Sequence, residues 1–169
     1  MDINQFKAKK QIRPVIFNKK GQLLILREKG SETWRLPEGE FNYSTGTDKE
    51  ISSRAREIAR SQTGIPIEYV ADKLSVPFNE GYVVPAMEEG KESTTEINQI
   101  TIVPMLGEGD FLGEKNIEAG WMLVRDAAIF PTMEDKIKEA HNELYTQGLF
   151  INNSIPADFT TNRVIGTSN

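Results

Sequence analysis

The segment from Trp34 to Ile65 limits most tightly how this chain can fold. It reads as a short strand, a glycine-bearing loop, one amphipathic helix and a glycine stop. The apolar face of that helix is given by residues that recur at offsets of three and four, namely Ile51, Ala55, Ile58, Ala59 and Gln62. The spacing therefore predicts one helix that packs against the rest of the fold.

Both ends of this predicted helix carry recognisable signals. Thr47 or Asp48 offers a side-chain oxygen to the unpaired amides of the first turn, and Glu50 adds negative charge near the positive end of the helix. Gly64, followed by Pro66, ends it. The sequence thus predicts where the helix starts and where it stops.

Aliphatic and β-branched runs on both sides of this helix predict a sheet. Residues 12–17 and 23–26, separated by a turn with Asn18 and Gly21, indicate a hairpin. We expect further strands within residues 67–76, 81–86, 97–106 and 120–124, and Pro104 suggests a bulge or an edge. Residues 135–147 show helical spacing again before a glycine. The lone histidine, His141, lies on or beside that helix's apolar face, and we interpret it as a packing residue.

Length and composition predict one soluble domain. The chain has 169 residues, of which 38% are hydrophobic and 27% charged, and its apolar runs are far shorter than a membrane span. We assign residues 1–151 to a single domain with its core at about 10–148. Residues 152–169 lose periodicity, and we expect a flexible tail or an arm that docks.

Charge and cysteine content narrow the class of partner. The chain has no cysteine, and its start lacks the apolar core of a secretory signal, so we expect a cytoplasmic protein. A net charge of −5 argues against general nucleic-acid binding. The basic start of the chain is interpreted as a soluble arm, and its residues are Lys7, Lys9, Lys10 and Arg13. A homodimer is left open.

The strand, L-P-x-G, helix and T-G-I of the central segment resemble the Nudix box, G-x5-E-x7-R-E-U-x-E-E-x-G-U with U apolar. The resemblance implies an α/β/α sandwich in which a mixed sheet lies between helices, with a cleft for a nucleoside diphosphate linked to another moiety. Counting back from Gly64, Ile58 takes the place of one box Glu, and Ser61 and Gln62 take the place of the Glu pair. In an alternative register shifted by one residue, Arg56, Glu57 and Ile58 match R-E-U, and Arg60 and Ser61 stand at the Glu pair.

These losses bear on the metal that the family uses. Magnesium prefers near-octahedral oxygen ligation and bridges phosphate oxygens during hydrolysis, so it needs converging carboxylates. The remaining candidates for catalysis are Glu57, Glu50 and Glu40, and Glu57 and Glu50 are the candidates for metal binding. Glu50 and Glu57 share a helix face with Arg54 between them, which favours internal ion pairing over a metal site.

Four further residues are assigned to ligand binding by the resemblance: Trp34, Gly39, Arg27 and Arg35. In the family a basic residue near Arg27 often faces substrate phosphate, whereas solvent exposure is the plain alternative for both arginines. Trp34 can stack a base or pack in the core. A loop Glu acts as base in some family members, which makes Glu108 or Glu114 a candidate, against the alternative of a solvated loop.

Three functions remain open. The leading hypothesis is a Nudix-fold protein with a degenerate metal-binding box that binds a nucleotide-like ligand or another partner, with little or no pyrophosphohydrolase activity and no required cofactor. The second is a divergent Mg²⁺-dependent Nudix pyrophosphohydrolase that uses the remaining carboxylates. The third is a protein-interaction module on the same fold.

Overall fold

The computed structural model describes residues 6–41, 47–71, 78–84 and 94–151. The strands are β1 (Phe6–Phe17), β2 (Leu23–Glu28), β3 (Gly39–Glu40), β4 (Ile67–Val70), β5 (Phe78–Val84), β6 (Thr94–Gly107) and β7 (Ile117–Met122). The helices are α1 (Asp48–Thr63), the 3-10 helix η2 (Val124–Ile129) and α2 (Glu134–Thr146). No helix among these described residues is long and apolar enough to cross a membrane.

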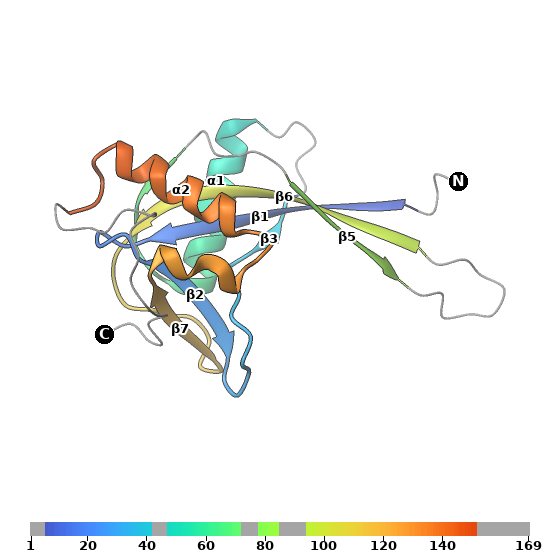
Figure 1. Ribbon diagram of the computed structural model, residues 1–169, viewed down its shortest axis with the longest axis horizontal. Coiled ribbons are helices and arrows are strands. Elements are labelled where there is room, and N and C mark those ends of the chain that lie inside the picture. The colour runs from blue at the N-terminus through green and yellow to red at the C-terminus, as the bar shows by residue number, and fades with distance from the viewer. Residues whose placement is uncertain (1–5, 42–46, 72–77, 85–93, 152–169) are drawn as a thin grey trace.

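The strands form one mixed sheet with the order β4-β6-β1-β2-β7, and β3 and β5 pair with β1 and β6 outside this path. The long central strands β1 and β6 run parallel, and the other pairs are antiparallel. Figure 1 shows α1 and α2 on opposite sides of this sheet. The prediction of an α/β sandwich with a mixed sheet between helices is confirmed.

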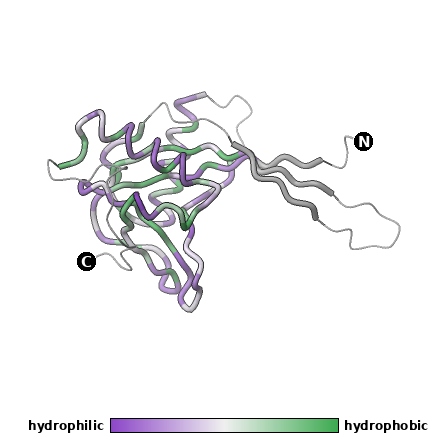
Figure 2. Tube along the Cα trace, viewed as in Figure 1, coloured by the Kyte–Doolittle hydropathy of each residue, from purple (hydrophilic) through white to green (hydrophobic). Residues whose placement is uncertain are grey.

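Alternation along the strands divides the core into two layers, because successive side chains point to opposite faces of a sheet. Val15 and Phe17 of β1 join the apolar cluster under α2, whereas Ile12 and Ile16 join the cluster under α1. Figure 2 shows the hydrophobic residues gathered in the strands at the centre of the body. One apolar face of the sheet thus packs against α1 and positions it.

The predicted hairpin is present as β1 and β2, with Phe17 paired to Leu23. Asn18 organises the turn, since its side-chain oxygen accepts from the amides of Lys20 and Gln22 at 3.0 Å each. Gly21 adopts a φ of 76°, a conformation that favours glycine.

Several predicted boundaries were wrong. The basic start is not an arm, because residues 6–10 belong to β1 and pair with β6. Pro104 does not lie on an edge strand, because β6 has neighbours on both sides. Its carbonyl accepts from Ala71 at 2.9 Å just beyond the end of β4, so the missing N–H falls where that ladder has ended. The predicted tail, residues 152–169, lies outside the described residues.

Candidate functional site

Helix α1 begins and ends as its sequence signals indicate. Thr47 is the N-cap: its hydroxyl accepts from the Glu50 amide at 3.3 Å and donates to the Glu50 carboxylate at 3.1 Å. Gly64 ends the helix with a φ of 67°. The Glu50 carboxylate is thus engaged by the capping hydroxyl at the start of the helix.

Arg54 lies at the centre of the exposed box face of α1. Its Nη1 donates to the Glu57 carboxylate at 2.8 Å, and its Nε donates to the backbone carbonyl of Glu40 at 2.9 Å. The predicted ion pairing on this face is therefore confirmed. The contact with Glu40 joins α1 to β3 across 14 residues of sequence, and no local sequence signal pointed to it.

Two of the three positions at which the ungapped register loses its carboxylates, Ile58 and Gln62, hold the loop on the helix, whereas Ser61 bonds within the helix. Ile58 is only 2% exposed, and a Cβ on Gly39 would lie 2.8 Å from its Cδ1 atom. Gln62 donates to the Glu38 carbonyl at 2.6 Å and accepts from the Glu38 amide at 3.3 Å. Ser61 donates to the Ile58 carbonyl at 3.2 Å. The helix thus holds the L-P-x-G loop with an amide and an apolar side chain.

The burial of Ile58 bears on the register of the box. In the ungapped register this position would carry a metal-binding carboxylate, and that carboxylate would point into the apolar layer under α1. In the shifted register the same position is the apolar one. Burial therefore favours the shifted register, in which Glu57, Arg60 and Ser61 stand where the family has carboxylates.

The three candidate carboxylates do not gather around one point. The Glu50 and Glu57 positions are separated by seven residues of helix, a rise of about 10 Å. Glu50 is held by Thr47, and Glu57 by Arg54. Among the described residues, no group of three or more His, Cys, Asp or Glu side chains is arranged to hold a metal ion.

A cleft of about 350 Å³ lies on the loop side of α1. Its lining includes Leu26, Glu28, Arg35, Glu38, Ser61, Gln62, Glu114, Asn116 and Ile117. Arg35 is paired with Glu28 at 3.1 Å, and Arg13 is paired with Glu38 at 2.9 Å. A hydrogen bond from its own backbone, together with Arg35, lowers the pKa of Glu28. The cleft therefore contains the Arg35–Glu28 pair, the Glu38 carboxylate that Arg13 holds from outside the lining, and the further carboxylate of Glu114.

The two remaining predicted ligand residues lie against each other. The guanidinium of Arg27 is 4.4 Å from the Trp34 ring centroid, and its Nε donates to Glu118 at 2.8 Å. Trp34 also packs against the apolar cluster under α2. One face of the indole is thus covered by a cation, a stable cation–π arrangement that leaves that face closed to a base.

The candidate loop bases differ in position. Glu114 lines the cleft, whereas Glu108 accepts from the backbone amide of Lys19 at 3.1 Å. Sequence reasoning did not single out Glu38, although Glu38 contacts both Gln62 and Arg13. These partners are 24 and 25 residues away, so no local pattern could reveal them.

The chain matches no protein-family model and no curated protein. Its structure is similar to a MutT described for Aliivibrio salmonicida and Vibrio cholerae, with 13% identity, coverage of 81% of this chain and 99% of the other, and a TM-score of 0.47. It is also similar to a C. elegans Ap4A hydrolase in a binary complex, with 13% identity, coverage of 83% of this chain and 98% of the other, and a TM-score of 0.47. A MutT/nudix family protein from Enterococcus faecalis shares 17% identity, with coverage of 69% of this chain and 44% of the other and a TM-score of 0.36. At these values the likeness is one of overall fold and says nothing about activity.

Proposed function

We propose that this protein binds a nucleoside diphosphate-linked or similar ligand and hydrolyses it slowly or not at all. The proposal joins two observations: the fold is a mixed α/β sandwich with cavities of ligand size, and the box face of its helix is occupied by the protein's own contacts. A Nudix fold with a degenerate box is the reading that accommodates both.

The observation that carries the proposal is the position of Arg54. A divalent ion on this face would need the Glu57 carboxylate, and the guanidinium already donates to that carboxylate at 2.8 Å. The Arg54 side chain is 28% exposed and is also anchored to β3, so it is a resident counter-ion. Magnesium would have to displace one positive charge, and among the described residues no group of three or more His, Cys, Asp or Glu side chains is arranged to hold it.

The residues present therefore do not fit a magnesium ion of the Nudix kind. In the register that the burial of Ile58 favours, Arg60 and Ser61 stand at the Glu pair of the box, so Glu57 is the one box carboxylate that the helix retains.

A panel of ligands tests the proposal. ADP-ribose, dinucleoside polyphosphates and nucleotide sugars would each be added to the protein with EDTA, Mg²⁺ or Mn²⁺, and both the melting temperature and the products would be measured. We expect at least one class to raise the melting temperature equally with and without metal, because a ligand bound only by the folded state stabilises it by mass action.

The same panel separates the rival functions. Metal-dependent turnover at about 1 per second or faster would establish the divergent hydrolase and overturn the proposal. No stabilisation by any compound would leave no support for a nucleotide-like ligand and would favour the interaction module.

A further inference from the structure

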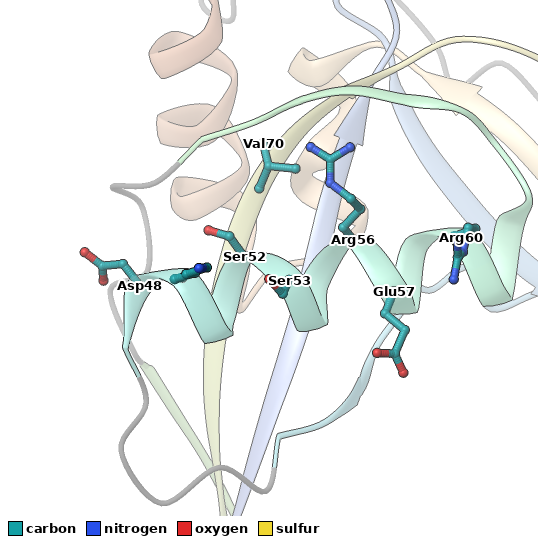
Figure 3. A pocket seen from close by; sticks show the side chains of 8 residues that line it. Asp48, Ser52, Ser53, Arg56, Glu57, Arg60 and Val70 are labelled. Atoms are coloured by element: carbon teal, nitrogen blue, oxygen red, sulfur yellow. The ribbon is translucent and has the colours of Figure 1, made fainter.

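A second and larger cavity lies on the other flank of α1. It has a volume of about 740 Å³ and opens between the helix and β4. Figure 3 shows Ser52 and Arg56 on the side of the helix that faces Val70, while Glu57 projects to the opposite side. We call this cavity the outer groove, and its lining includes Lys49, Ser52, Arg56, Arg60 and Val70.

Positive charge dominates the outer groove. Lys49, Arg56 and Arg60 line it together with the acids Asp48 and Glu57. The carboxylate of Glu57 is neutralised by Arg54. Lys49 and Arg60 are exposed and have no ion-pair partner in the part of the chain that the structure describes. The groove therefore presents two unpaired cations against one unpaired acid, before Arg56 is counted.

The spacing of these cations suits one extended anion. Arg56 and Arg60 are four residues apart and Lys49 is seven residues before Arg56, so the three follow one stripe of the helix. Arg56 forms a 3.3 Å hydrogen bond from its Nη1 to the Ile67 carbonyl, and within the described ranges of the chain its other N–H groups have no further partner. A guanidinium offers a fork of donors that matches phosphate oxygens.

The cleft on the loop side is a poorer host for an anion. Arg35, the arginine that lines it, is already paired with Glu28, and the lining carboxylate Glu38 is paired with Arg13. A phosphate would have to break one of these pairs and would then face Glu114. In the outer groove the phosphate would meet Lys49 and Arg60 without first breaking an ion pair among the described residues.

We propose that the outer groove binds the phosphate groups of a nucleotide-sized anion, with Arg56 and Arg60 receiving the phosphates and Lys49 a more distant negative or polar group. This inference rests on the proposed function for the class of ligand. It places the phosphate-binding site on the side of α1 that faces β4 and not on the loop side. The volume of about 740 Å³ fits a nucleotide. The net charge of −5 disfavours a long polyanion such as nucleic acid.

The test is calorimetric titration of the full chain with ADP, and separately with pyrophosphate, in EDTA. The variant carries Lys49→Glu and Arg60→Glu. These changes affect the helix in opposite directions, because an acid is favourable in the first turn and unfavourable in the last. We expect ADP affinity to fall at least tenfold. The matched control, Lys20→Glu with Lys29→Glu, changes the charge equally away from α1 and should bind like the parent.

The outcomes separate this inference from the proposed function. ADP binding that is unchanged in the α1 variant but lost in Arg35→Ala overturns the outer groove and keeps a nucleotide site in the cleft. An equal loss in the variant and the control also overturns it, as a general charge effect. Binding of a single-stranded oligonucleotide more tightly than ADP would assign the groove to nucleic acid instead. No ADP or pyrophosphate binding by the parent would contradict both proposals.

Discussion

Gly39 has two possible roles, in ligand binding and in packing. By resemblance it belongs to a ligand-binding loop, yet its missing side chain is explained by packing alone. A Cβ there would lie 2.8 Å from both Cδ1 and Cγ1 of Ile58. Ile58 in turn is buried in the layer under α1. The close approach of the loop to the helix therefore requires glycine whatever the ligand is.

We expect Gly39→Ala to lower the free energy of unfolding by about 1–3 kcal/mol through overpacking. Ile58→Ala removes both colliding atoms, so the double variant should lose less stability than the sum of the two single variants. Urea unfolding of the four proteins measures this coupling. An unchanged stability in Gly39→Ala together with lost ligand binding would instead assign the residue to the ligand.

His141 is the buried titratable residue in the layer under α2. It is 1% exposed, both ring nitrogens lack a hydrogen-bond partner among the described residues, and its ring contacts Phe17 and Phe150. Burial lowers the pKa of His141 from 6.5 to about 4. The packing role predicted for this residue fits its surroundings.

The shift sets a direction for acid sensitivity. Because the pKa is lower in the folded state, the unfolded chain binds the proton first, and stability falls as the pH drops from about 6.5 towards 4. The loss is on the order of 3 kcal/mol. His141→Leu should flatten the curve of unfolding free energy against pH in this window. Curves that are equally steep for the parent and for His141→Leu would contradict the assignment.

Helix α1 is the element on which the site depends, and its ends are set by local chemistry. Thr47→Ala should reduce the free energy of unfolding by about 1 kcal/mol, because it removes the cap and the partner of Glu50. Ser53→Ala, an exposed change inside the same helix, should leave stability equal or slightly higher. Equal losses in both variants, measured by urea unfolding, would contradict the capping role.

A second prediction on this helix tests whether its exposed face can hold a metal ion once the Arg54 cation is replaced. Arg54→Glu with Ser61→Glu places carboxylates at positions 54, 57 and 61, one face at helical spacing, and keeps Gln62 for the loop. The variant should melt lower in EDTA because like charges repel, and should recover in millimolar Mg²⁺. Arg54→Gln is the control and should not respond. A response of the parent itself would favour the divergent hydrolase.

The parts of the fold that were predictable are those set by neighbouring residues. The cap, the glycine stop and the Arg54–Glu57 pair lie within a few positions of their partners and were visible in the sequence. The full lengths of β1 and β6 depend on parallel pairing between segments about 90 residues apart, and polar residues at their ends hid them. The contacts of Glu38 and Glu40 with α1 likewise arise only when the loop folds onto the helix.

At the scale of the whole molecule, the last described residues, Phe150 and Ile151, are held against the rest of the fold. Phe150 is 8% exposed, and the Ile151 amide donates to the Lys19 carbonyl at 2.8 Å. We expect deletion of residues 154–169 to change the melting temperature by less than about 2 °C, under about 1 kcal/mol. Deletion from residue 150 onward should cost more, because it exposes the Phe17 and His141 cluster. A large drop with the shorter deletion would show that the tail contributes to the fold or to a dimer.

We propose that this Nudix-like fold binds a phosphate-containing ligand and does not carry out metal-assisted hydrolysis. Phosphorus NMR of the protein with ADP-ribose and millimolar Mg²⁺ tests both halves in one sample. We expect the diphosphate signals to shift or broaden as the protein is added, and no AMP or ribose phosphate signal to grow over hours. Unperturbed ligand signals, or steady growth of the product signals that stops in EDTA, would contradict the claim.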